Sequence, residues 1–91
     1  MRYFRTTAFQ SLYRKLPSDR QEAADKALRV LEDALASGRP TGGLGLKVLR
    51  RGVWEIRAGL LDRIVFCRTK DLIEFLVIGT HDEIRRFLKG R

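Results

Sequence analysis

The sequence has very little cysteine and histidine. It holds one cysteine, Cys67, and one histidine, His81. A single cysteine cannot form an internal disulfide, and these two residues cannot assemble a zinc site of the usual four-ligand type. We therefore expect Cys67 to pack as a small apolar side chain. We also expect no bound metal or cofactor.

Long apolar runs are absent as well. A membrane-spanning helix needs about 20 consecutive apolar residues, and a secretory signal peptide needs an apolar segment near the N-terminus. The sequence shows neither, so we expect a cytoplasmic protein without a membrane partner. Its 91 residues, of which 44% are apolar, suffice for one modest core. We expect a single globular domain over residues 1–91.

Acidic residues are few relative to basic ones. The chain has 19 Lys and Arg against 11 Asp and Glu, which gives a net charge of +8. Such a charge favours RNA, DNA or an acidic protein as partner, although it also fits a basic surface that only aids solubility. Clustering favours a partner, because six cations fall in or beside the predicted strands: Lys47, Arg50, Arg51, Arg57, Arg63 and Arg68. Lys47, Arg50 and Arg51 are candidate contacts to RNA or phosphate.

The first part of the chain predicts a strand and a helix. Residues Arg2–Thr6 are rich in strand-forming residues. The segment Thr7–Gln10 is typical of a capping box with Thr7 as the cap, and apolar residues at helical spacing follow it. Pro17 ends this helix.

A second helix is expected at once. Ser18–Gln21 is again typical of a capping box, and Gly38 and Pro40 supply stop signals. We expect a helical hairpin whose apolar stripes face one side of a sheet. Polar residues of the second helix, such as Arg20, are expected to face solvent.

From Lys47 onward polar and apolar residues alternate, as they do in strands. The segment Gly59–Asp62 predicts a turn between two of these strands. If the turn is a three-residue loop that closes Gly59 against Arg63, Arg57 and Arg63 lie on the same face of the sheet. A register shift of one residue would place them on opposite faces.

The last helix is predicted by a third capping box, Thr80–Glu83. This places His81 in the first helical turn. There the positive end of the helix dipole favours the neutral imidazole, which can accept a proton. The alternative is a surface histidine beside a cap.

Two segments resemble a known family: GLGLKVLRRGVWEIRAGLLDRIVF (Gly43–Phe66) and GTHDEIRRFL (Gly79–Leu88). They are similar to the RelE/ParE superfamily of bacterial type II toxins, and the likeness extends over essentially the whole chain. The resemblance implies an α+β fold. In that fold a small, largely antiparallel four-stranded sheet packs against an N-terminal helical hairpin, and a short C-terminal helix follows.

The resemblance also implies a function. RelE-like members cleave messenger RNA in the ribosomal A site, whereas ParE-like members share the fold and act on DNA gyrase. We therefore expect the toxin of a toxin-antitoxin pair, with a cognate antitoxin protein as partner. The first interpretation is an mRNA endonuclease that acts with mRNA and the ribosome. The alternatives are a non-enzymatic inhibitor of gyrase or another protein, and an inactive basic RNA-binding relative.

Site residues follow from the same resemblance. Arg63 matches the arginine that faces the scissile phosphate, Arg57 stands in place of a catalytic lysine, and His81 falls where nucleases carry arginine or histidine. Glu55 stands in place of a second lysine, and Phe87 replaces a tyrosine. In metal-free cleavage the two arginines would stabilise charge on the phosphate, and Glu55 and His81 would act as base and acid in either order.

Overall fold

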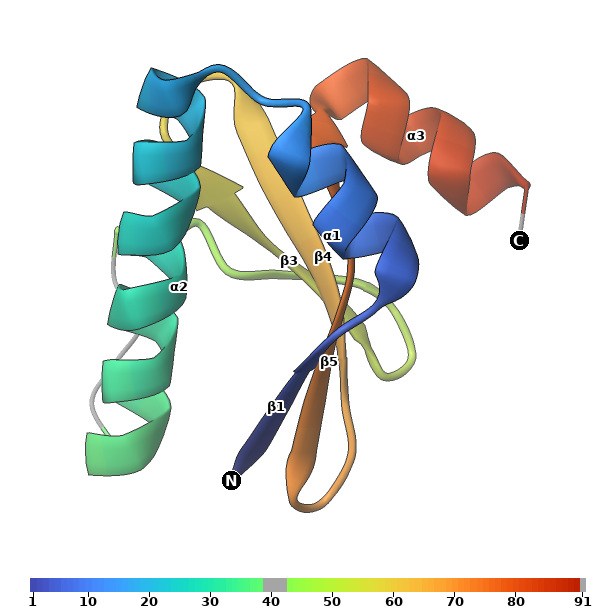
Figure 1. Cartoon of the computed structure of the whole chain (residues 1–91). Helices are drawn as coiled ribbons and strands as arrows, with labels where there is room; N and C mark the ends of the chain where they lie inside the picture. Colours follow the sequence, from blue (N-terminus) through green and yellow to red (C-terminus); the bar gives the residue numbers. More distant parts are fainter. Residues whose placement is uncertain (39–42, 91) are drawn as a thin grey trace.

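The computed structural model describes residues 1–38 and 43–90 as a five-stranded sheet with three helices (Figure 1). The elements are β1 (Arg2–Arg5), α1 (Thr7–Arg14), α2 (Ser18–Ser37), β2 (Lys47–Arg50), β3 (Val53–Ala58), β4 (Asp62–Arg68), β5 (Leu72–Thr80) and α3 (His81–Lys89). The strands lie in the order β1-β5-β4-β3-β2, with β1 parallel to β5 and all other neighbours antiparallel. The expected α+β class is confirmed.

The first face of the sheet forms the main core together with α1 and α2. Phe9 of α1 and Leu28 and Leu31 of α2 are almost completely buried against this face. The strand residues that meet them are Ile56, Ala58, Ile64, Phe66, Ile73, Phe75 and Ile78. Burying one large apolar side chain stabilises a fold by roughly 1.5–3 kcal/mol. The expected helical hairpin on one side of the sheet is therefore confirmed.

The second face is covered in part by α3, which lies on the opposite side of the strands from α2 (Figure 1). Val65 of β4, Val77 of β5 and Ile84 of α3 form a smaller buried cluster, and Phe87 and Leu88 pack against it. None of the three helices, so far as the structure describes the chain, is long and apolar enough to cross a membrane.

The predicted sheet was one strand short. β2 adds a fifth strand at one edge, where Lys47 pairs with Glu55 and Val48 pairs with Trp54. The strand has four residues, its register shifts after Val48, and most of its side chains are exposed. Because it is so short and irregular, its pattern is too brief to mark a strand in the sequence.

The first predicted cap lies one residue too late. Thr6, rather than Thr7, caps α1, because its Oγ1 accepts the backbone N–H of Phe9 at 3.1 Å. The side chain of Gln10 donates to the carbonyl of Arg5. Two adjacent threonines fit the sequence pattern equally well, and only the backbone conformation distinguishes them.

The second predicted cap is wrong. Pro17 is the N-cap of α2 and offers no side-chain cap, and Gln21 donates instead to the carbonyl of Tyr13 at 3.0 Å. The predicted stop at Gly38 is confirmed, since this glycine ends α2 in the left-handed conformation. Pro40 lies outside the described residues.

Candidate phosphate-binding site

The β3–β4 hairpin brings two arginines side by side. Arg57 pairs directly with Arg63, and Ala58 pairs with Asp62 across a three-residue turn. The closing pair is therefore not Gly59 with Arg63, as expected. Both registers keep Arg57 and Arg63 on one face, because directly opposite residues share a face. The predicted proximity of the two arginines is thus confirmed.

Glu55 engages Arg63 in an ion pair. Nη1 of Arg63 donates to Oε2 of Glu55 at 2.6 Å, and the two side chains are 26% and 5% exposed. Lys47 stands opposite Glu55 on β2, so its side chain belongs to the same face. This part of the face therefore brings three cations, Lys47, Arg57 and Arg63, close to the Glu55 carboxylate. A carboxylate in this position holds Arg63 in place.

Arg57 is the exposed member of the arginine pair. Its backbone N–H donates to the carbonyl of Leu44 at 2.7 Å, and its side chain crosses Gly45 so closely that a Cβ there would lie 3.0 Å from Cγ, Cδ and Nε. A hollow of about 140 Å³ beside the two arginines is lined by Arg57, Gly59, Leu60, Asp62 and Arg63. Guanidinium groups on either side of such a hollow can donate to the oxygens of a phosphate.

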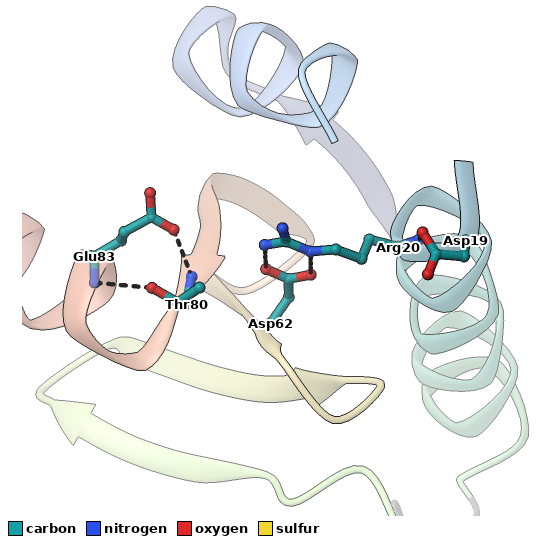
Figure 2. A network of polar contacts seen from close by, with 5 residues as sticks. All are labelled: Asp19, Arg20, Asp62, Thr80 and Glu83. Carbon is teal, nitrogen blue, oxygen red and sulfur yellow. Dashed lines mark hydrogen bonds and ion pairs between the residues drawn. The ribbon is translucent and has the colours of Figure 1, made fainter. Parts of the chain in front are cut away.

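His81 lies at the same end of the sheet. It is the first residue of α3, directly after Thr80, which pairs with Asp62. The predicted capping box is confirmed, since Thr80 Oγ1 accepts from the Glu83 amide and the Glu83 carboxylate accepts from the Thr80 amide (Figure 2). Within the described residues His81 is exposed and forms no hydrogen bond or ion pair with Arg63.

The cations that cluster in or beside the predicted strands are divided between two ends of the sheet. Lys47 lies beside Glu55, but Arg50 and Arg51 lie at the β2–β3 turn, at the opposite end of β3 from Arg57. Nη2 of Arg50 donates to the carbonyl of Leu88 at 2.9 Å and so ties β2 to the end of α3. The structure therefore separates Arg50 and Arg51 from the arginine pair.

A buried ion pair that the sequence did not reveal connects α2 with the sheet. Arg20 donates two hydrogen bonds to Asp62, at 2.8 and 2.6 Å, and the Asp62 side chain is completely buried (Figure 2). The expectation that Arg20 faces solvent is wrong. Its hydrogen bond to Asp62 raises the pKa of the Arg20 guanidinium above its ordinary value. No local pattern signals this pair, because 42 residues separate its members.

A second group of cations lies on α3 and on the neighbouring strand β2. Arg50, Arg85, Arg86 and Lys89 line a hollow of about 500 Å³ together with Asp82 and Leu88. The signal in the sequence was the spacing of Asp82, Arg85, Arg86 and Lys89, which repeats every three or four residues and so marks one side of a helix. Among the described residues no group of three metal-ligating side chains forms a candidate metal site.

Comparisons with known proteins identify the architecture. No protein-family model and no curated protein sequence matches the chain. A copper-bound mutant toxin from Helicobacter pylori matches with a TM-score of 0.69 and 15% identity, over 92% of this chain and 98% of that one. The RelB-RelE antitoxin-toxin complex from Methanococcus jannaschii matches with a TM-score of 0.69 and 16% identity, over 92% of this chain and 96% of that one. The DinJ-YafQ complex from E. coli matches with a TM-score of 0.64 and 16% identity, over 92% of this chain and 98% of that one. This chain therefore has the fold shared by RelE, YafQ and the Helicobacter pylori toxin.

Proposed function

We propose that the chain, as a single domain over residues 1–91, is a RelE/ParE-type toxin of a toxin-antitoxin pair that cleaves translated messenger RNA. The observation that carries this proposal is the arginine pair. Arg57 and Arg63 stand directly opposite each other on the second sheet face, beside a hollow that they line together. Lys47 adds a further positive charge on this face. Such an arrangement fits a substrate with a charged backbone and a reaction that builds charge on phosphate oxygens.

The residues divide the proposed reaction among them. Attack of a 2′-hydroxyl on the neighbouring phosphate forms a new P–O2′ bond and breaks the P–O5′ bond. The 2′-hydroxyl loses its proton to a base, and the released 5′-oxygen takes up a proton from an acid. Arg57 and Arg63 donate to the phosphate oxygens throughout. His81, at the end of the sheet where both arginines lie, carries out one of these two proton transfers, as base or as acid, and water carries out the other. Glu55 acts as a positioning residue, because its ion pair fixes the Arg63 guanidinium.

The proposed partners are a cognate antitoxin, messenger RNA and the ribosome, and the proposed place of action is the cytoplasm. Two of the solved structures that share this fold contain a second protein, RelB in one and DinJ in the other. A net charge of +8 favours an acidic antitoxin. An antitoxin encoded beside this chain should restore growth and co-purify with it. Recovery of the toxin alone, with no change in growth, would contradict this partner.

A different observation favours a second candidate, a non-enzymatic inhibitor of gyrase or another protein. Leu60 and Leu61, at the tip of the β3–β4 turn, have relative exposures of 104% and 60%. Adjacent exposed leucines beside the arginine pair fit a protein target better than a polynucleotide. For an inhibitor of this kind, Leu60→Ser/Leu61→Ser should abolish toxicity while Arg57→Ala/His81→Ala leaves it intact.

The nuclease proposal is tested by removing charge without disturbing the fold. Arg57→Ala should reduce cleavage of a translated message by about 100-fold, the scale of losing one charge-stabilising donor. His81→Ala should reduce it by about 100-fold or more, because positioned acid-base groups contribute at least that factor. Both side chains are exposed, so the stability of each variant should equal that of the parent. Cleavage is measured with and without ribosomes, in EDTA, and products are examined for a 2′,3′-cyclic phosphate.

Two further variants sharpen this test. Arg63→Ala alone would leave the buried carboxylate of Glu55 unpaired, so Arg63 is removed together with that charge in Glu55→Gln/Arg63→Gln. Arg29→Ala, on the exposed side of α2, is the control and should keep full activity. Full cleavage by Arg57→Ala/His81→Ala would exclude the proposed nuclease site. Loss of parental activity in EDTA would exclude the metal-free reaction.

A further inference from the structure

The hollow beside α3 is the second strongly basic region of the described chain, and the arginine pair does not contribute to it. Its cations come from two elements, with Arg50 from β2 and Arg85, Arg86 and Lys89 from α3. All four side chains belong to exposed residues. The carboxylate of Asp82 reduces their total charge and lies one turn before Arg85 and Arg86. The hollow thus carries a net charge of about three.

The three cations of α3 lie outside its apolar contacts with the sheet. Ile84, Phe87 and Leu88 form the apolar side of α3, whereas Arg85, Arg86 and Lys89 lie on its outer side. Like charges one turn apart on a helix are destabilising. An anionic ligand would relieve this repulsion. The bond from Arg50 to the Leu88 carbonyl positions the fourth cation at the end of the helix.

The composition of the hollow favours a polynucleotide over an acidic protein segment. Protein segments that dock on a surface usually place apolar side chains in an apolar groove. This hollow offers one apolar residue, Leu88, among four cations. Three of these cations are arginines, whose guanidinium groups suit the oxygens of a phosphodiester.

The position of the hollow suits a chain that continues beyond the arginine pair. α3 begins beside β4, where Thr80 pairs with Asp62, and ends where Arg50 holds the Leu88 carbonyl. Nine helical residues extend about 13 Å. A flexible polynucleotide bound at Arg57 and Arg63 can therefore reach the hollow within a few nucleotides.

We propose that Arg50, Arg85, Arg86 and Lys89 form an auxiliary site for the phosphodiester backbone of single-stranded RNA, separate from the residues that act on the scissile phosphate. This inference rests on the proposed function for its choice of ligand. It predicts sequence-independent, salt-sensitive binding, because the side chains contact the backbone.

The test is equilibrium binding of a non-cleavable 2′-O-methyl RNA of about ten nucleotides to the full-length protein. The variant Arg85→Gln/Arg86→Gln/Lys89→Gln keeps good helix formers. The control Arg14→Gln/Lys26→Gln/Arg29→Gln removes the same charge from exposed residues of α1 and α2. The α3 variant should bind at least tenfold more weakly, and its slope of log affinity against log salt should be shallower by about two. The affinity of the control variant for the RNA, and its salt dependence, should change much less.

Three results would overturn the inference. Equal losses in both variants would show that only the overall charge matters, and no loss in the α3 variant would show that RNA does not bind there. Stronger α3-dependent binding of a polyglutamate peptide than of the RNA would assign the hollow to an acidic protein. Binding is measured without cleavage, so a failed nuclease assay with intact α3-dependent RNA binding would remove the proposed reaction and leave this site standing.

Discussion

The position of Arg57 depends on a glycine in the segment that leads into β2. Gly45 has φ of +63° and lies beneath the aliphatic part of the Arg57 side chain. Gly43, two residues earlier, has φ of +88° but no heavy atom within 4 Å of the position that a Cβ would take. The two glycines therefore share a backbone requirement, and only one of them also makes room for a site residue.

Alanine substitutions at Gly43 and Gly45 distinguish the cost of backbone strain from the effect on the position of the Arg57 side chain. Gly43→Ala and Gly45→Ala should each lower the free energy of unfolding by about 1 kcal/mol, because the left-handed backbone disfavours a Cβ. If the proposed function holds, Gly45→Ala should in addition reduce RNA cleavage by about tenfold, because it moves Arg57, a proposed phosphate-binding group. Urea unfolding and cleavage rates check the pair. Equal cleavage by both variants would show that Gly45 does not position Arg57.

The position of a single residue could be predicted from the sequence where the two-residue alternation of a strand determines which face its side chain lies on. Arg57 and Arg63 could be placed on one face because alternation and a short turn leave few registers. The ion pair between Glu55 and Arg63 could not be predicted, since it depends on side-chain rotamers and on how deeply β3 is buried. A resemblance that suggests proton transfer for Glu55 carries no information on that contact.

At the scale of elements, the pair Arg20–Asp62 joins the start of α2 to the start of β4. Asp62 is also paired by backbone with Thr80, the cap of α3. This one buried ion pair therefore connects three elements close to the candidate site: α2, β4 and the start of α3. Its loss should loosen the end of the sheet from which His81 projects.

Removing one member of this pair should be costly. Arg20→Ala leaves the buried Asp62 carboxylate without its partner and should lower the free energy of unfolding by about 3 kcal/mol, near the low end for buried pairs because Arg20 is 26% exposed. Arg29→Ala, an exposed arginine on the same helix, should change it by less than about 0.5 kcal/mol. Denaturant titration measures both. A loss below about 1 kcal/mol for Arg20→Ala would mean that solvent replaces the arginine.

The capping box of α3 predicts a pH-dependent contribution. The backbone amide of Thr80 is the main cause that lowers the pKa of Glu83 below its ordinary value of 4.5. A lowered folded-state pKa means that the stabilisation is fully present above pH 4.5 and is lost as pH falls through the folded value. Glu83→Gln should be less stable than the parent by about 0.5 kcal/mol near neutral pH. This difference should shrink as the pH falls below 4.5, and a constant difference in unfolding titrations would contradict it.

Helices and strands were predicted from the sequence better than their ends were. Apolar spacing identified α1, α2 and α3 because burial of one stripe requires it. Their caps were predicted correctly only at Thr80. At α1 two neighbouring threonines compete, and at α2 the N-cap is Pro17, which has no side chain that can cap the helix. In both helices, which residue becomes the N-cap depends on how the helix packs against the rest of the fold, and the local sequence does not contain that information.

At the scale of the whole molecule, β5 is the strand on which the sheet depends. It lies between β1 and β4, and its hydrogen bonds reach both. The hydroxyl of Thr6 donates to the carbonyl of Leu76, 70 residues later. The N-terminal strand therefore has no strand partner until β5 has been synthesised.

This topology sets the time at which the protein can act. A growing chain on the ribosome holds β1, α1 and α2 long before β5 and α3 exist, so neither the sheet nor the end that carries His81 can assemble. A protein proposed to stop translation would thus be inert until β5 and α3 have left the ribosome. Protease digestion of stalled nascent chains checks this timing. Protection should arise only after Leu72–Thr80 has emerged, and protection of shorter chains would show that the fold forms without β5.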